Sequence, residues 1–427
     1  MALLSYGVSL RFKIFRGRSS YAAIIGAEAC ANLEITPLES FIVTRVLDLV
    51  VVLTLRSSVR ILFSSTPAFG HLLPMLPLAA AARRDGHEVA VLSHPSMTTS
   101  IAQMPLLPAG PSIPETLQDV TRRTETDALH DTSGPVEFFV ESRISLGAEA
   151  ALSAAASFAP DLIVADVVDY LGQLAAASLN VPWVAHGAAL PLESGMADAL
   201  DGAAAAHFAR RSVTPVAPVA YIDPWPDSLL GENYTLPAER IAIRPEPHSD
   251  ENITWSRPQF VGREDRPLVL VTLGTVVDDN ATLAAILDSL GTLDVNVVAA
   301  PHAVTDFEDY PVDSMRIHLA GFVPMKLLLE EVDVVVSSAG AGSVLSALSA
   351  ARPMVLFPMG LDKPLNAARA AEAGAAVVID AADQAGDAVA RVLADHAVAD
   401  GAAAVADEIA RMNSADEVLR LVLKRLR

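Results

Sequence analysis

Residues 332–376 read VDVVVSSAGAGSVLSALSAARPMVLFPMGLDKPLNAARAAEAGAA. The run 332–336 is short, apolar and rich in β-branched residues, which predicts a buried parallel strand. A loop of small residues at 338–343 follows, and then a segment at 344–351 that we expect to be a helix. The free N–H groups at the start of such a helix can bind a phosphate, and glycines let it approach. The same turn is about as often a matter of tight packing alone.

A second strand, predicted at residues 353–358, leads into a polar segment. Asp362, Lys363 and Asn366 follow that strand. They would therefore lie at the carboxyl edge of a parallel sheet, which is where open α/β sheets bind ligands.

This block resembles the donor-binding signature of the family 1 glycosyltransferases, which include bacterial antibiotic and macrolide glycosyltransferases and the UDP-glycosyltransferases. The family pattern runs HGGxGT, AL, GxP, P, DQ and NA. The residues that fall at its spacing are Gly340, Gly342, Ser343, Ala347, Leu348, Pro353, Pro358, Asp362, Asn366 and Ala367. The resemblance implies the GT-B architecture, an α/β fold with two facing doubly wound Rossmann-like domains.

Three residues depart from the pattern. Ser338 stands where the family has histidine, Ala339 where it has the first glycine, and Lys363 where it has glutamine. Lys363 can still donate a hydrogen bond and adds positive charge near the expected diphosphate. The resemblance also assigns the intervening Ala341 to the donor loop.

Two further segments resemble donor-binding parts of the family. Gly274 and Thr275 follow a predicted strand at 268–272, where the family loop contacts the phosphates. Phe322 and Val323 resemble the segment whose main chain contacts the nucleotide base. Ordinary packing at a strand end is the alternative reading of both.

Composition limits the class of protein. A chain of 427 residues with 52% apolar residues can bury two cores. The net charge of −21 without a basic block argues against a nucleic-acid groove. Cys30 is the only cysteine, so no disulfide can form within the chain, and a reducing, cytoplasmic location fits.

The chain order suggests four parts. We interpret residues 1–58 as an extension outside the fold, 59–240 as an acceptor-binding domain, 241–267 as a linker and 268–427 as the donor-binding domain. The apolar run 41–55 is short and contains Arg45 and Asp48, so we do not expect a membrane span. The last helix, expected at 414–427, commonly crosses back onto the first domain in this family.

The first domain predicts strands at 60–65, 88–93, 160–166 and 182–186, and helices at 72–84 and 170–179. It lacks GxGxxG, so a nicotinamide dinucleotide site is not expected. Residues 100–145 are polar and proline-rich, and such excursions above a parallel sheet usually form the walls of a substrate pocket.

His71 is the candidate base because an alcohol must lose its proton to become a good nucleophile. It lies in FGHLLP, which resembles the family motif GHxxP, whose histidine is the catalytic base. Asp166 ends another strand, at the position where a family aspartate holds that histidine. Asp169 is the competing partner, interpreted instead as a surface or helix N-terminal charge. A histidine at a helix start is otherwise often only a polar cap.

The remaining histidines carry weaker predictions. We interpret His87 as structural. His94 and His186 end strands and could face an acceptor pocket or simply be buried.

These residues predict a glycosyltransferase that moves a sugar from a dTDP- or UDP-sugar to a hydroxyl of a hydrophobic natural product. Neither a cofactor nor a metal site is expected, and attack from one face implies inversion. A dimer is possible. The alternative function is a catalytically silent partner of another glycosyltransferase, which the three departures would suit.

Overall fold

The computed structural model describes residues 58–426, apart from 102–103, 126, 129–130, 232–233, 235, 251, 275–279, 301–312 and 322. The predicted extension lies outside these residues except for Ser58. Ser58 Oγ donates a hydrogen bond to Gly86 O at 3.1 Å, and the Val59 N–H donates to His87 Nδ1 at 3.2 Å. The first strand, at Arg60–Ser64, begins at the residue where it was expected.

The first sheet is parallel, with strand order β3-β2-β1-β4-β5-β6-β7. Its strands are β1 (Arg60–Ser64), β2 (Glu88–Ser93), β3 (Leu106–Pro108), β4 (Leu162–Asp166), β5 (Trp183–His186), β6 (Tyr221–Asp223) and β7 (Arg240–Ala242). The order reverses between β1 and β4, which makes their carboxyl ends the topological switch point.

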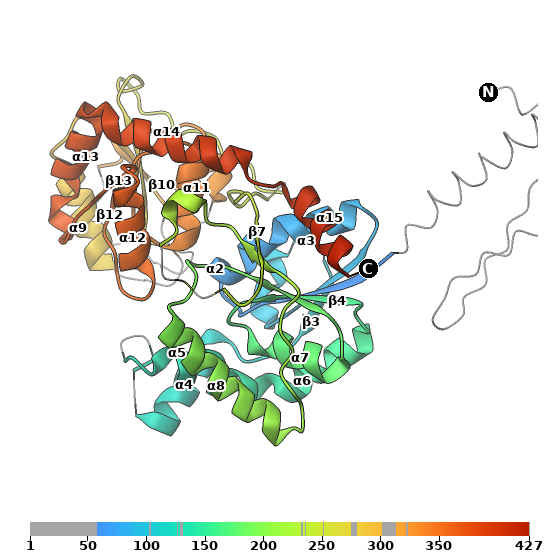
Figure 1. Cartoon of the computed structure of the whole chain (residues 1–427). Helices are drawn as coiled ribbons and strands as arrows, with labels where there is room; N and C mark the ends of the chain where they lie inside the picture. The colour runs from blue at the N-terminus through green and yellow to red at the C-terminus, as the bar shows by residue number, and fades with distance from the viewer. Residues whose placement is uncertain are drawn as a thin grey trace, which may run out of the picture. The chain divides into compact units, whose positions relative to one another are not determined.

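The second sheet repeats this pattern, with order β10-β9-β8-β11-β12-β13. It belongs to the part of the chain coloured yellow to red in Figure 1. Its strands are β8 (Leu268–Thr272), β9 (Asn296–Ala299), β10 (Ile317–Leu319), β11 (Val334–Ser337), β12 (Met354–Leu356) and β13 (Ala376–Val378). All pairs are parallel, and the switch point lies between β8 and β11. Two doubly wound sheets confirm the predicted fold class.

Helices connect the strands. In the first half they are α2 (Phe69–Leu72), α3 (Leu76–Arg84), α4 (Ile113–Thr124), α5 (Gly134–Val136), α6 (Arg143–Phe158), α7 (Tyr170–Leu179) and α8 (Ser194–Arg210), with the 3-10 helices η1 (Leu73–Met75), η2 (Pro95–Ser100) and η4 (Asp227–Leu229) and the π-helix η3 (Glu137–Ser142). In the second half they are α9 (Asn280–Leu290), α10 (Met325–Leu329), α11 (Ala341–Ser349), α12 (Lys363–Glu372), η5 (Ala382–Gln384), α13 (Ala385–Ala394), α14 (His396–Arg411) and α15 (Ala415–Arg425).

Both sheets are buried on both faces, which is why their central strands are continuous apolar runs. The first sheet packs against α3 and α15 on one face and against α6 and α7 on the other. The second packs against α9 and α13 on one face and against α10, α11, α12 and α14 on the other. Trp225, from the first half, is fully buried in the latter cluster.

The structure differs from the predicted elements in three places. The predicted helix at 72–84 is split into α2, η1 and α3, because Pro74 and Pro77 begin new helical segments and lack an N–H. The apolar pattern at 316–323 predicts one strand, but β10 ends at Leu319, and Gly321 follows with a φ of +64°. Residues 241–242 belong to β7, although we expected them in the linker.

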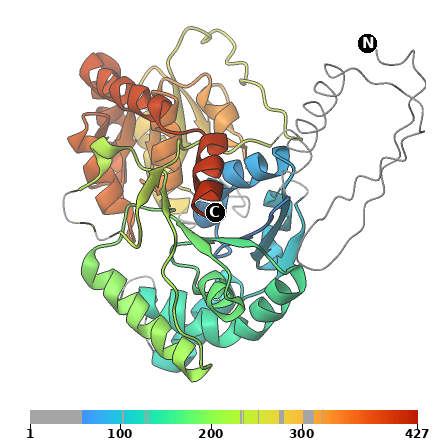
Figure 2. The same cartoon turned by 45° about the vertical axis from the view of Figure 1, so that its right-hand side comes forward.

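The chain passes between the two halves at two points that lie next to each other. Ile243, just after β7, forms a parallel bridge with Asn413, between α14 and α15. The Arg244 N–H donates to Asn413 O, and Asn413 Nδ2 donates to Ala242 O, each at 2.8 Å. α15 then packs against α3 (Figure 2). Within the described part of the chain, no helix combines the length and apolarity needed to cross a bilayer.

Candidate active site

The switch point of the first sheet brings His71 and Asp166 together. β1 leads into α2, which carries His71, and Asp166 is the last residue of β4, the neighbouring strand. His71 Nδ1 lies 2.8 Å from Asp166 Oδ2. The carboxylate is completely buried, whereas the imidazole is 23% exposed. One nitrogen of the ring is thus held by the carboxylate while part of the ring stays accessible.

The surroundings raise the pKa of His71. Burial alone would lower this pKa, but the charge of Asp166 and its hydrogen bond to the ring outweigh burial. The charge of Asp362, from the second half of the chain, raises the pKa further, while Arg143 opposes it. His71 and Asp362 therefore lie close enough to influence each other electrostatically.

Asp169 is not the partner of His71. It is the N-cap residue of α7, as its interpretation as a helix N-terminal charge predicted, but it does not lie at the surface. Its side chain is 1% exposed and accepts a hydrogen bond from Arg143 Nη2 at 2.7 Å, and the Arg143 side chain is equally buried. Ser64 Oγ donates to the other carboxylate oxygen. Asp169 thus joins β1, α6 and α7 beneath the site.

The other histidines differ in their surroundings. His87 accepts the Val59 N–H and lies 3.5 Å from Asp85, so it has the structural role that we predicted. His94 caps η2 by accepting the Ser96 N–H. His186 is fully buried and stands opposite Asp166 in the strand register, with Nδ1 2.8 Å from Gly187 O and no hydrogen-bond partner for Nε2 among the described residues. Burial lowers the pKa of His186 to about 4, so its ring stays neutral.

The switch point of the second sheet holds the candidate donor loop. α11 begins at Ala341, earlier than expected, because Gly340 has the extended backbone of an N-cap residue. The N–H groups of Ala341, Gly342 and Ser343 therefore have no acceptor within the helix. Neither Gly340 nor Gly342 has a positive φ, and a Cβ at either would have no atom within 4 Å. These glycines leave open space at the helix start, as a phosphate cradle requires.

Two of the departures from the family pattern shape this loop. Ser338 is buried, and its hydroxyl donates to Leu273 O at 2.7 Å, which ties the ends of β11 and β8 together. Ala339 has a φ of +64°, a left-handed conformation that glycine adopts without the penalty of a side chain. The structure therefore keeps the backbone geometry of a glycine at an alanine.

The polar residues after β12 stabilise the same loop. Asn366 is buried and donates through Nδ2 to Ala339 O at 3.0 Å and to Asp362 Oδ2 at 2.8 Å. Lys363 is also buried, and its Nζ donates to Met359 O at 3.4 Å. Burial lowers the pKa of Lys363, which the charge of Asp362 partly offsets. The ammonium has no carboxylate within ion-pairing distance among the described residues, so its remaining donors are available to an anion.

The remaining predicted donor residues are only partly described. Gly274 lies two residues after the end of β8 and has a φ of +80°, with its N–H 3.4 Å from Thr272 Oγ1. Val323 is half-buried and packs against the second-sheet core. Thr275 and Phe322 lie outside the described residues.

Phe139 is the residue near the site that sequence reasoning missed. It belongs to η3, within the proline-rich excursion predicted to form pocket walls. Its ring centroid lies 5.6 Å from that of His71, with the two planes tilted by 54°. The only sequence signal is the pair Phe138-Phe139 among charged residues.

No group of three or more potential metal-ligating side chains occurs in the described part of the chain. The described residues place an imidazole–carboxylate pair at one switch point and a helix start with a buried lysine at the other.

Comparison with known proteins gives this geometry a family context. Residues 284–424 match the model of the erythromycin biosynthesis protein CIII-like C-terminal domain. The L-demethylnoviosyl transferase of Streptomyces niveus is 29% identical over 74% of this chain and 84% of its own. The elloramycin glycosyltransferase of Streptomyces olivaceus is 27% identical over 85% of this chain and 96% of its own.

Solved structures of glycosyltransferases share the fold of this chain. A glycosyltransferase of Streptomyces sp. SF2575, complexed with thymidine diphosphate, aligns with a TM-score of 0.70 and 25% identity, over 86% of this chain and 99% of its own. The chain is thus a GT-B glycosyltransferase, homologous to the bacterial antibiotic glycosyltransferases and related in its C-terminal domain to the erythromycin biosynthesis protein CIII-like family.

Proposed function

We propose that this enzyme transfers a sugar, of the deoxysugar type, from a dTDP- or UDP-sugar to a hydroxyl of a hydrophobic natural product, with inversion and without a metal ion. Homologues named for antibiotic glycosyl transfer support the sugar and acceptor classes. The thymidine diphosphate bound to a structural neighbour supports a dTDP donor.

One observation carries the proposal. His71 and Asp166 form a 2.8 Å pair at one switch point, and Asp362, from the donor side, acts on the pKa of the same imidazole. A base and a donor loop that influence each other electrostatically suit a reaction between two substrates held by different domains.

The proposed reaction is a single displacement. His71 Nε2 takes the proton of the acceptor hydroxyl while that oxygen attacks the anomeric carbon. The bond from the anomeric carbon to the diphosphate oxygen breaks, and the nucleoside diphosphate leaves with the electron pair. Asp166 holds Nδ1 and stabilises the imidazolium that forms. Attack opposite the leaving group inverts the anomeric carbon.

The donor side would stabilise the leaving diphosphate without a cation. The free N–H groups at the start of α11 and the positive end of the helix dipole favour an anion there. Lys363 adds a positive charge, and a bound diphosphate would offset the burial that lowers its pKa. Metal independence is tested by assaying turnover with excess EDTA.

The test of the base is substitution at His71 and Asp166. His71→Ala should abolish transfer but leave donor affinity intact, and Asp166→Asn should lower the rate by roughly 10²-fold to 10⁴-fold. His396→Ala, on the exposed start of α14, is the matched control. Wild-type rates in both site variants would rule out this pair as the catalytic base.

The silent-partner function is the second candidate, because the Ser338 hydroxyl is already donated to Leu273 O and Ala339 has a glycine-like backbone. Calorimetric titration with dTDP and UDP separates the two. The enzyme should bind either nucleotide more tightly after Ser338→His and more weakly after Lys363→Ala. Binding restored only by Ser338→His, from none in the wild type, would favour the silent partner.

A further inference from the structure

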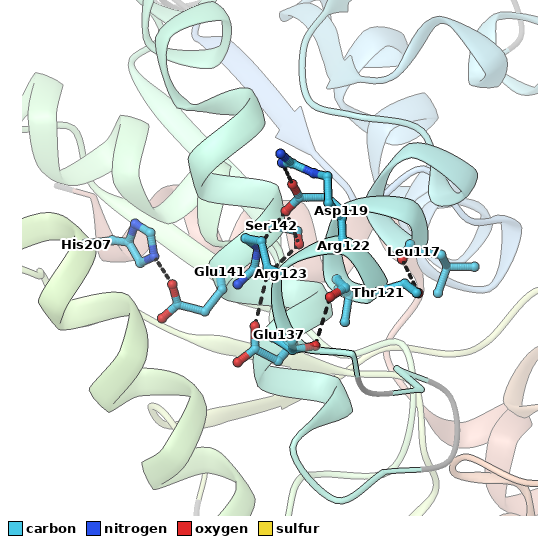
Figure 3. A network of polar contacts seen from close by, with 11 residues as sticks. Leu117, Asp119, Thr121, Arg122, Arg123, Glu137, Glu141, Ser142 and His207 are labelled. Atoms are coloured by element: carbon cyan, nitrogen blue, oxygen red, sulfur yellow. Dashed lines mark hydrogen bonds and ion pairs between the residues drawn. The ribbon is translucent and has the colours of Figure 1, made fainter.

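The π-helix η3 is held in place by its polar side chains. Arg123, on α4, contacts both ends of this segment: Nη2 lies 2.9 Å from Glu137 Oε2 and 2.9 Å from Ser142 Oγ (Figure 3). Arg123 Nε donates to Asp119 at 2.8 Å, and Ser142 Oγ donates to the same carboxylate at 2.8 Å. We call this group, Asp119, Arg123, Glu137 and Ser142, the η3 clamp.

The carboxylate at the centre of the clamp is shielded from solvent. The Asp119 side chain is 6% exposed. Burial would raise the pKa of Asp119, but hydrogen bonds from Arg123, Arg122 and Ser142 outweigh it and hold the pKa at about 2. Asp119 therefore stays charged at neutral pH.

Two charged side chains near the end of η3 also form ion pairs. Glu141 Oε2 lies 2.8 Å from His207 Nε2 on α8 (Figure 3), and Arg143 pairs with Asp169. The Val140 side chain is buried in the cluster shared by α6, α7 and α8. Phe138 and Phe139 are left half-buried, with ring centroids 5.0 Å apart in an edge-to-face arrangement.

Phe139 is the one of these two rings that reaches the imidazole. Part of it rests on the α6–α8 cluster, and it lies 5.6 Å from His71. A π-turn is uncommon and occurs frequently at functional sites, because the extra residue redirects side chains. Here it directs an aromatic ring to the proposed base.

We propose that Phe139 selects the acceptor, by stacking on a flat aromatic ring that carries the hydroxyl group deprotonated by His71, and that Arg123 positions Phe139. This inference rests on the proposed function and specifies its acceptor class as a phenolic ring system. Offset or edge-to-face aromatic contacts are favourable beyond the area that they bury, which an aliphatic macrocycle cannot match. Phe139 touches substrate in this proposal, whereas Arg123 acts only through the segment that it holds.

The experiment uses the full chain and two acceptor probes, a hydroxyanthraquinone and a hydroxylated macrolactone of similar size. Binding is followed without a donor through the imidazole NMR signal of His71, which the ring current of Phe139 shifts. Phe139→Leu should weaken anthraquinone binding by about threefold to tenfold and affect the macrolactone less. Phe139→Tyr should retain binding.

Two variants of Arg123 and one control variant separate positioning from general destabilisation. Arg123→Gln should weaken anthraquinone binding in the same direction and change the His71 ring-current shift, while Arg123→Lys should restore part of both. Phe158→Leu, at the far end of α6 where the ring lies under Arg60, is the matched control and should change neither.

The outcomes distinguish this inference from the proposed function. If the probes bind as expected but no variant or wild type transfers a sugar, the proposed reaction fails and the acceptor assignment stands. Wild-type anthraquinone binding in Phe139→Leu, or an equal loss for both probes, would overturn the assignment. An unchanged ring-current shift in Arg123→Gln would overturn the positioning role.

Discussion

The buried His186 should make the enzyme lose stability in acid, and replacing it should remove that loss. The change is His186→Asn, which keeps a donor toward Gly187 O but cannot titrate. In the folded protein burial lowers the pKa of His186 to about 4, whereas an unfolded chain has a histidine pKa of about 6.5. Only the unfolded state therefore binds this proton between these two pH values.

The magnitude follows from the difference in pKa. As pH falls from about 6.5 to about 4, the free energy of unfolding of the wild type should decrease by about 3 kcal/mol from this group alone. At pH 7 His186 contributes almost nothing, because both states are neutral. His71 acts in the opposite sense: its raised pKa stabilises the fold below pH 6.5, and that contribution is lost as pH rises through the raised value.

The assay is urea unfolding of wild type and His186→Asn at several pH values between about 7 and about 4. A cost of the substitution that does not depend on pH shifts the whole plot of unfolding free energy against pH. The informative quantity is therefore the difference in slope between the two proteins. The imidazole NMR signal that disappears in the variant belongs to His186, and its titration in the wild type measures the pKa of that residue independently. Parallel stability curves, or a His186 signal that titrates near pH 6.5, would refute the reasoning.

Three further predictions concern other parts of the molecule. The acid limb of kcat/KM for the acceptor should lie above pH 6.5, the ordinary histidine value, and Asp362→Asn should move it to lower pH, because the carboxylate raises the pKa of His71; an unmoved limb would contradict this. Arg143→Met should lower the free energy of unfolding by about 3–5 kcal/mol, since Asp169 stays buried without its partner, and adding Asp169→Asn should recover much of it in urea unfolding. A chain that starts at Ser58 should keep the thermal stability of the full chain, because the first strand of the first sheet begins at Arg60; a large drop in Tm would show that the preceding residues belong to the fold.

Most of the fold could be predicted because buried parallel strands leave a clear sequence signal. The predicted strands at 88–93 and 268–272 and the helix at 170–179 match β2, β8 and α7. The predicted helix boundaries were wrong where the backbone itself sets the end of a helix. Pro74 and Pro77, for example, divide one apolar pattern into three segments. Strand order could not be read from periodicity, since it depends on which crossovers pack.

The site could be predicted where residues follow strands directly. His71 and Asp166 are far apart in sequence, but adjacent parallel strands end at one edge, and the structure brings the two side chains together. The burial of Asp169 could not be predicted, because an aspartate at a helix start is usually exposed and its buried partner, Arg143, lies on a different helix. Phe139 could not be placed, because a π-turn and its clamp depend on contacts between separate helices.

The two crossings between the halves of the chain meet at Ile243 and Asn413, and that meeting point has a mechanical consequence. Sliding one half along the other would break the hydrogen bonds from Arg244 and Asn413, whereas a rotation about the bridge preserves them. These hydrogen bonds therefore favour a rotation about the bridge over a slide. Such a rotation would change the separation of His71 and Asp362, and it would also have to move Trp225, which belongs to the first half and is buried in the second-sheet core.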